Sequence, residues 1–156
     1  MSDRKPLVGI VLVSHSGPVA DSVAALAGGL AGGLAGGLAG GLAGGLAGGL
    51  AGGATAPVSA AGGTRDGGLG TSSELITAAA RRVDRGAGVA LLVDLGSAVL
   101  TVKALIADGG ELPDGARLVD APFVEGAVAA VVTASAGADI AAVEKAAQEA
   151  YGYRKV

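Results

Sequence analysis

His15 is the single histidine of the chain, and Ser14 and Ser16 flank it. A neutral imidazole acts as a base or a nucleophile near neutral pH, because its unperturbed pKa is about 6.5. The segment that follows, Gly17-Pro18, is typical of a helix start. A helix N-terminus attracts anions through its free amides and its dipole. The spacing therefore predicts an acid–base residue or a phosphoryl carrier beside an anion site.

A carboxylate is the expected partner of this imidazole. When a carboxylate accepts a hydrogen bond from one ring nitrogen, the lone pair of the other nitrogen is free to react, as in catalytic triads. Asp94, which ends an apolar run, is the first candidate. Asp66 and Asp120 are weaker alternatives, and plain capping of a loop is the non-functional interpretation of Asp94.

Several function classes are excluded by what the sequence lacks. With no Cys there is no disulfide, thiolate nucleophile or iron–sulfur cluster, and one His excludes a multi-His metal site within one chain. The P-loop, G-x-G-x-x-G and G-x-S-x-G motifs are absent. A net charge of −3, with one Phe, two Tyr and no Trp, argues against a nucleic-acid interface.

The elements that position these residues alternate along the chain. Continuous apolar runs predict buried strands at Val8–Val13 and Val89–Val93. Two further strands are expected at Pro57–Ala61 and Arg117–Ala121. Helices are expected between and after them: one from Pro18, one behind a capping box at Thr71–Glu74, one over Ala98–Ala107, one over Glu125–Ser135, and a last one from Asp139. On the first helix, Val19, Val23 and Leu26 form the expected apolar stripe.

This alternation predicts an α/β domain with a mostly parallel central sheet and helices on both faces. In such sheets ligands bind beyond the carboxyl ends of the strands. The predicted functional edge therefore consists of Ser14–Gly17, Gly62–Gly70, Asp94–Ser97 and Pro122–Glu125.

A perfect LAGG repeat interrupts this domain. Seven copies fill Leu26–Gly53 and hold 14 of the 30 glycines. We expect a single domain over residues 1–156, with 26–53 as an inserted low-complexity segment. Each interior Gly costs a helix about 1 kcal/mol relative to Ala. One or two helical turns followed by a mobile loop are therefore expected, with a long protruding helix as the alternative, on the side opposite His15.

The 43 residues from Ser22 to Thr64 carry no charge, which raises the possibility of a membrane segment. Half of the repeat is Gly, however, and no aromatic belt or basic cluster flanks it. The apolar run near the N-terminus is explained better by a buried strand than by a signal peptide. The sequence therefore predicts a cytoplasmic protein.

Four motifs carry a family resemblance. In chain order they are VGIVLVSHS, AAGGTRDGGLGTS, LLVDLGSAVLT and RLVDAPFVEGAVAAVV. Together they resemble the phosphotransfer subunits (DhaM) of phosphoenolpyruvate-dependent dihydroxyacetone kinases, which are related to the enzyme IIA domains of mannose-family sugar phosphotransferase systems. The DLGSA and APFVEGA versions favour the dihydroxyacetone branch.

The resemblance implies a homodimeric, mannose-type enzyme IIA-like fold and a phosphotransferase subunit. His15 would accept a phosphoryl group from the carrier protein HPr and pass it to ADP held in the ADP-binding kinase subunit. Asp94 would orient the imidazole. No metal and no cofactor beyond the transient phosphohistidine is implied. The phosphoryl oxygens would be held by the amides of Gly62, Gly63 and Thr64 and by Ser97.

Three points stay open from the sequence. The chain could instead be a mannose-family enzyme IIA that feeds a sugar permease, or a non-catalytic regulatory module controlled by phosphorylation. Because the chain ends at Val156, without the fused domains of some relatives, the phosphoryl donor is expected to be a separate protein. The role of Arg65 is undefined.

Overall fold

The computed structural model describes residues 5–33 and 54–156. Its sheet has the strand order β2-β1-β3-β4, and every pairing in it is parallel. The strands are β1 (Gly9–Ser14), β2 (Val58–Gly62), β3 (Val89–Val93) and β4 (Ala116–Val119). The helices are α1 (Gly17–Gly33), α3 (Ser73–Val83), α4 (Gly96–Asp108), α5 (Phe123–Ser135) and α6 (Ile140–Glu149), followed by a short 3-10 helix, η2 (Ala150–Gly152).

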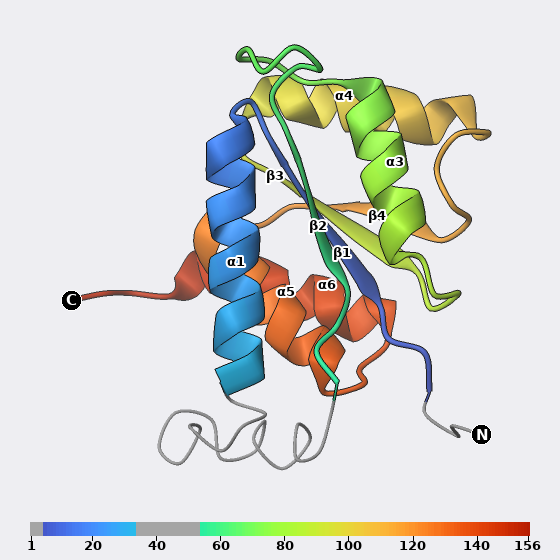
Figure 1. Cartoon of the computed structure of the whole chain (residues 1–156). Helices are drawn as coiled ribbons and strands as arrows, with labels where there is room; N and C mark the ends of the chain where they lie inside the picture. Colours follow the sequence, from blue (N-terminus) through green and yellow to red (C-terminus); the bar gives the residue numbers. More distant parts are fainter. Residues whose placement is uncertain (1–4, 34–53) are drawn as a thin grey trace.

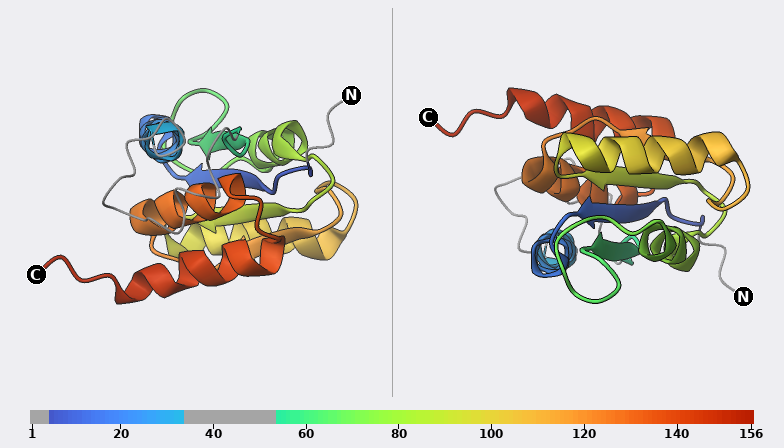
Figure 2. Two further views of the ribbon diagram at one scale, coloured as in Figure 1. Left: turned by 90° about the horizontal axis from the view of Figure 1, so that it is seen from below. Right: turned by 90° about the horizontal axis from the view of Figure 1, so that it is seen from above.

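These elements confirm the predicted α/β architecture, with strand ends and helix starts within two residues of those expected. All of the described strands are parallel, rather than most of them. Helices cover both faces of the sheet, with α1 on one side and α3 on the other (Figure 1 and Figure 2). Within residues 5–33 and 54–156, none of the helices has the length and apolarity needed to cross a bilayer.

The central strand β1 explains why the sheet has two hydrophobic layers. All six of its residues are buried. Ile10 and Leu12 face the layer formed with α1, α5 and α6, while Val11 and Val13 face the layer formed with α3 and α4. A strand buried on both faces needs apolar residues at every position, which is why its sequence is continuous rather than alternating.

Helix α1 packs through small residues, which corrects the expected stripe. Val23 is buried as predicted, but Val19 and Leu26 are each 45% exposed. The buried face instead carries Ala20, Ala27 and Ala31 as well as Val23. Alanine allows the helix axis to approach the sheet and α5 closely, whereas leucine at these positions would hold it away.

Helix α1 also contains the first two copies of the repeat, since it continues to Gly33. The predicted helical extension of one or two turns is thus present, and the predicted mobile loop lies outside the described residues. The end of α1 and the start of β2 lie at the end of the sheet opposite the β1–α1 junction (Figure 1).

The N-terminus of α3 is capped one residue later than the capping box predicts. Ser72 is the N-cap, and its side chain accepts a hydrogen bond from the amide of Leu75 at 3.2 Å. Thr71 instead contacts the hydroxyl of Thr101 on α4 at 3.0 Å. Glu74 is ion-paired with Arg65, so it is not the reciprocal partner of the cap.

Gly62 lets β2 end directly against the start of α1. A Cβ built on Gly62 would lie 2.7 Å from the Cα of Gly17 and 2.8 Å from the Cβ of Ala20, and it would also strike the carbonyl oxygen of Ser16. Any side chain here must displace backbone. The residue therefore fixes the position of the segment that carries His15.

We predict that Gly62→Ala lowers the free energy of unfolding by about 1–3 kcal/mol through overpacking. The matched control is Gly28→Ala within α1, where a Cβ meets nothing within 4 Å. That change should raise the free energy of unfolding by about 0.5–1 kcal/mol, because Ala is the better helix former. Urea unfolding measures both, and equal effects of the two substitutions would contradict this packing.

Candidate functional site

The parallel pairing of β1 with β3 brings His15 and Asp94 together. Val13 pairs with Val93 in the register of the two strands, so the residues that follow leave the sheet side by side. The amide of Asp94 donates a hydrogen bond to the carbonyl of Val13 at 3.0 Å, which extends the ladder past the last pair. The histidine and the carboxylate, 79 residues apart in sequence, are thus placed by the backbone.

The carboxylate of Asp94 receives hydrogen bonds on both oxygens. Its Oδ1 lies 2.9 Å from the Nδ1 atom of His15 and 2.7 Å from the amide of Leu95. Its Oδ2 accepts from the amide of His15 at 3.0 Å and from the Ser14 hydroxyl at 2.9 Å. The predicted pairing of Asp94 with the imidazole is therefore present in the structure.

These contacts determine the charge of Asp94. Burial opposes ionisation and by itself would raise the pKa of the carboxyl group. The hydrogen bonds from the amide and imidazole of His15 and from the Ser14 hydroxyl outweigh burial, and the net result is a pKa below the usual 3.8. Asp94 is consequently a carboxylate, which can only accept hydrogen bonds, near neutral pH.

An ionised Asp94 fixes the tautomer of His15. Because Oδ1 can only accept, the proton of a neutral imidazole lies on Nδ1 and the lone pair lies on Nε2. The Nε2 atom contacts the hydroxyl of Ser97, which acts as donor in this tautomer. The side chain of His15 is 24% exposed, so a partner can reach it from solvent. In this arrangement Nε2 is the nucleophilic nitrogen, and the contact of Asp94 with Nδ1 orients the ring.

The first turn of α4 contacts the imidazole through Ser97. Helix α1 begins at Gly17, two residues after His15, and Ser97 is the second residue of α4. The positive end of the α4 dipole therefore lies beside the Nε2 atom, where it favours a bound anion. Within the described ranges, no cluster of three or more His, Cys, Asp or Glu side chains is placed to hold a metal ion.

The loop after β2 packs against the backbone of the histidine segment. The amide of Gly63 donates to the carbonyl of Ser14 at 3.0 Å, and the amide of Gly70 donates to that of His15 at 2.9 Å. The amide of Thr64 donates to the carbonyl of Gly68 at 3.0 Å. In this structure the amides of Gly63 and Thr64 thus donate to carbonyls within and beside the loop. That they, or the amide of Gly62, bind a phosphoryl group stays a prediction.

The weaker carboxylate candidates lie elsewhere. Asp66 accepts from the Thr64 hydroxyl within its own loop, and Asp120 accepts from the hydroxyl of Tyr151 at 2.7 Å. Arg65 forms an exposed ion pair with Glu74. Of the three candidate carboxylates, Asp94 is the one in contact with His15.

The sequence did not point to Ser14, whose hydroxyl donates to Asp94 at 2.9 Å. From the sequence it is one of two serines that flank the histidine. In the structure its hydroxyl reaches the carboxylate, while that of Ser16 accepts from the amide of Val19 at 3.3 Å and caps α1. The available signal was position: Ser14 directly continues the apolar run of β1, lies inside the fold, and a buried polar side chain needs a partner.

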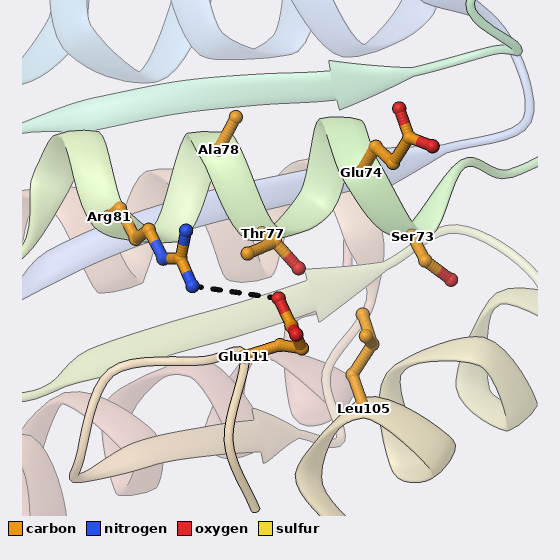
Figure 3. Close-up of a pocket in the computed structure, with 7 residues that line it drawn as sticks. All are labelled: Ser73, Glu74, Thr77, Ala78, Arg81, Leu105 and Glu111. Carbon is orange, nitrogen blue, oxygen red and sulfur yellow. Dashed lines mark ion pairs between the residues drawn. The ribbon is translucent and has the colours of Figure 1, made fainter. Parts of the chain in front are cut away.

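A separate hollow of about 420 Å³ lies between α3 and α4 (Figure 3). The ion pair between Arg81 and Glu111, at 3.5 Å, crosses it. Its lining residues include none of the predicted site residues: they are Ser73, Glu74, Thr77, Ala78, Arg81, Leu105 and Glu111. It is therefore not part of the histidine site.

A family model and a solved structure both match this chain. Residues 37–144 match the EIIA-man family model, described as "PTS system fructose IIA component". That segment contains Asp94 and Ser97 and begins after His15. Among solved structures, the crystal structure of EF1359, a protein of unknown function, is similar with a TM-score of 0.70 at 26% identity, covering 96% of this chain and 99% of that one.

Two curated relatives share a printed description. The phosphoryl donor subunit DhaM of a phosphoenolpyruvate-dependent dihydroxyacetone kinase from Providencia stuartii is 29% identical over 146 residues, which is 92% of this chain and 27% of that protein. The corresponding subunit of dihydroxyacetone kinase 2 from Listeria innocua is 28% identical over 127 residues, covering 81% and 85%. This chain thus spans about a quarter of the Providencia protein.

The lowered pKa of Asp94 predicts how stability depends on pH. A carboxyl group with a lower pKa in the folded than in the unfolded state stabilises the fold fully above its ordinary pKa of 3.8. That contribution is lost as the pH falls through the folded value.

We therefore expect the advantage of wild type over Asp94→Asn in urea unfolding to be constant above about pH 5 and to shrink below about pH 4. A difference that stays the same down to about pH 2 would contradict the hydrogen-bonded, ionised Asp94.

Proposed function

Because this chain belongs to the EIIA-man family of PTS system fructose IIA components, we propose that it carries a phosphoryl group on His15 and delivers it to dihydroxyacetone kinase. The observation that carries this proposal is the contact of His15 Nδ1 with Asp94 Oδ1 at 2.9 Å, with Nε2 directed to Ser97 at the start of α4. This arrangement leaves one defined nitrogen for phosphoryl transfer.

In the proposed first step, the Nε2 lone pair attacks the phosphorus of a donor phosphohistidine. The Nε2–P bond forms as the donor N–P bond breaks, and the donor imidazole leaves with the electron pair. The His15 ring then carries a phosphoryl group on Nε2 and a proton on Nδ1, so it is formally cationic. The negative charge of Asp94 stabilises this ring, and no proton needs to move.

Ser97 and the start of α4 would hold the transferred group. The Ser97 hydroxyl, which donates to Nε2 in the free protein, would donate to a phosphoryl oxygen after transfer. The dipole of α4 favours the negative charge of that group. Phosphoryl transfer depends mainly on positioning and on such charge stabilisation. In the second step, a terminal phosphate oxygen of ADP attacks phosphorus, and the electron pair returns to Nε2.

The dihydroxyacetone branch is supported by the two curated relatives, both described as phosphoryl donor subunits DhaM. On this proposal the donor is HPr, the acceptor is ADP bound in the ADP-binding subunit of the kinase, and the chain acts as a homodimer in the cytoplasm. The second candidate function, supply of a sugar permease, is favoured by the description of the family model as a fructose IIA component. A regulatory module without turnover is the third.

We predict that incubation with phosphoenolpyruvate, enzyme I and HPr adds an acid-labile group of about 80 Da to His15, one phosphoryl group. His15→Ala should receive none. Mass spectrometry of intact protein and of peptides measures both. Absence of the label from wild type, or its persistence in the variant, would refute the proposed carrier.

A chase of the labelled protein separates the three functions. Loss of the label to an ADP-loaded kinase subunit, with dihydroxyacetone phosphate as product, supports the first. Loss only to a mannose-type permease component supports the second. A label that neither acceptor removes supports the regulatory module.

We also predict that deleting Gly33–Gly48, four repeat units in register, leaves His15 phosphorylation within about twofold of wild type. The physical reason is distance, because the elements on either side of the deleted segment meet at the end of the sheet away from β1–α1 (Figure 1). The expected twofold limit assumes that changes at the surface, remote from a site, have little effect on that site. A folded deletion variant that accepts no phosphoryl group would overturn this prediction and the view of the repeat as an insertion.

A further inference from the structure

We propose that Ser14 is a positioning residue that holds the Asp94 carboxylate in the orientation required by His15. The effect of Ser14 on transfer rate rests on the proposed function, while its effect on the imidazole does not. The inference starts from burial: Ser14 is fully buried, at 0% exposure, at the last position of β1.

The direction of the Ser14 hydroxyl is fixed by its two neighbours. The amide of Ser16 lies 3.1 Å from Ser14 Oγ, and Asp94 Oδ2 lies 2.9 Å from it. An amide can only donate and a carboxylate can only accept. The hydroxyl therefore accepts from Ser16 and donates to Asp94, and the reverse orientation would lose both hydrogen bonds.

This bond controls which oxygen of Asp94 reaches the imidazole. With the amide of His15 as second donor, Ser14 holds Oδ2 against β1. A carboxylate held at one oxygen has its plane restricted, so Oδ1 is directed to Nδ1 of His15 at 2.9 Å. Without the hydroxyl, rotation of the carboxylate would become less costly, and the preference for a proton on Nδ1 would weaken.

Other serines of the domain have different partners. Ser16 caps α1, Ser97 contacts the reactive nitrogen itself, and Ser59, which is also buried, accepts from Arg82 at 2.8 Å. Ser59 lies on β2 and offers a matched control, because its loss removes a buried hydroxyl without touching Asp94.

The test compares Ser14→Ala with Ser59→Ala by long-range proton–nitrogen NMR of the unphosphorylated histidine ring. We expect wild type and Ser59→Ala to show the proton on Nδ1, and Ser14→Ala to show a mixture of both tautomers. Phosphorylation by phospho-HPr should slow about tenfold in Ser14→Ala, the effect of losing one hydrogen bond to a charged group. Ser14→Thr, which keeps the hydroxyl, should restore the Nδ1 tautomer.

A folded Ser14→Ala protein with the wild-type tautomer and rate would overturn the inference. If this variant does not fold, the nearly isosteric Ser14→Cys, a weaker donor, is measured instead, and a wild-type tautomer there has the same meaning. If Ser14→Ala mixes the tautomers while wild type accepts no phosphoryl group, the positioning role stands and the proposed function fails.

Discussion

The hydrogen bond between His15 Nδ1 and Asp94 Oδ1 is the contact on which the rest of the site depends. It connects residues that are 79 positions apart, and it exists because β1 and β3 are adjacent and parallel. Burial of Asp94 raises the pKa of its carboxyl group, and hydrogen bonds from the amide and imidazole of His15 and from the Ser14 hydroxyl outweigh that effect. The continuous apolar sequence of β1 is thus a functional constraint as well as a folding one, since it places the histidine segment.

The same arrangement explains how a phosphoryl group can be held and still be released. The α4 dipole and a hydroxyl stabilise negative charge, but less tightly than a bidentate Arg clamp would. Arg65, the cation in the loop after β2, is engaged by Glu74 at the surface rather than by the site. A carrier must give up the group that it accepts, and moderate stabilisation by fixed dipoles suits that requirement.

The sequence was sufficient for the order of strands and helices along the chain and for ranking Asp94 as the first candidate, but not for excluding Asp120. Strand-end position favours both Asp94 and Asp120, but β4 lies one strand further from β1 than β3 does, so only Asp94 reaches the histidine. That order is a property of the sheet and cannot be taken from local patterns.

Ser14 and the buried alanines of α1 were missed for a related reason. The partner of a buried hydroxyl depends on where the neighbouring strand ends, and the close approach of α1 to the sheet and α5 depends on tertiary packing. Periodicity favours the larger Val19 and Leu26 over Ala27. In both cases the contact depends on how close two separate elements lie, which local sequence patterns do not show.

The most direct test of the account is the position of the phosphoryl group on the imidazole. Phosphorus–nitrogen correlated NMR of the phosphorylated, histidine-labelled protein distinguishes the two ring nitrogens. The account predicts attachment at Nε2 with the proton on Nδ1, because Asp94 occupies the other side of the ring. Attachment at Nδ1 would contradict it, since the phosphoryl group would then have to replace the contact that orients the ring.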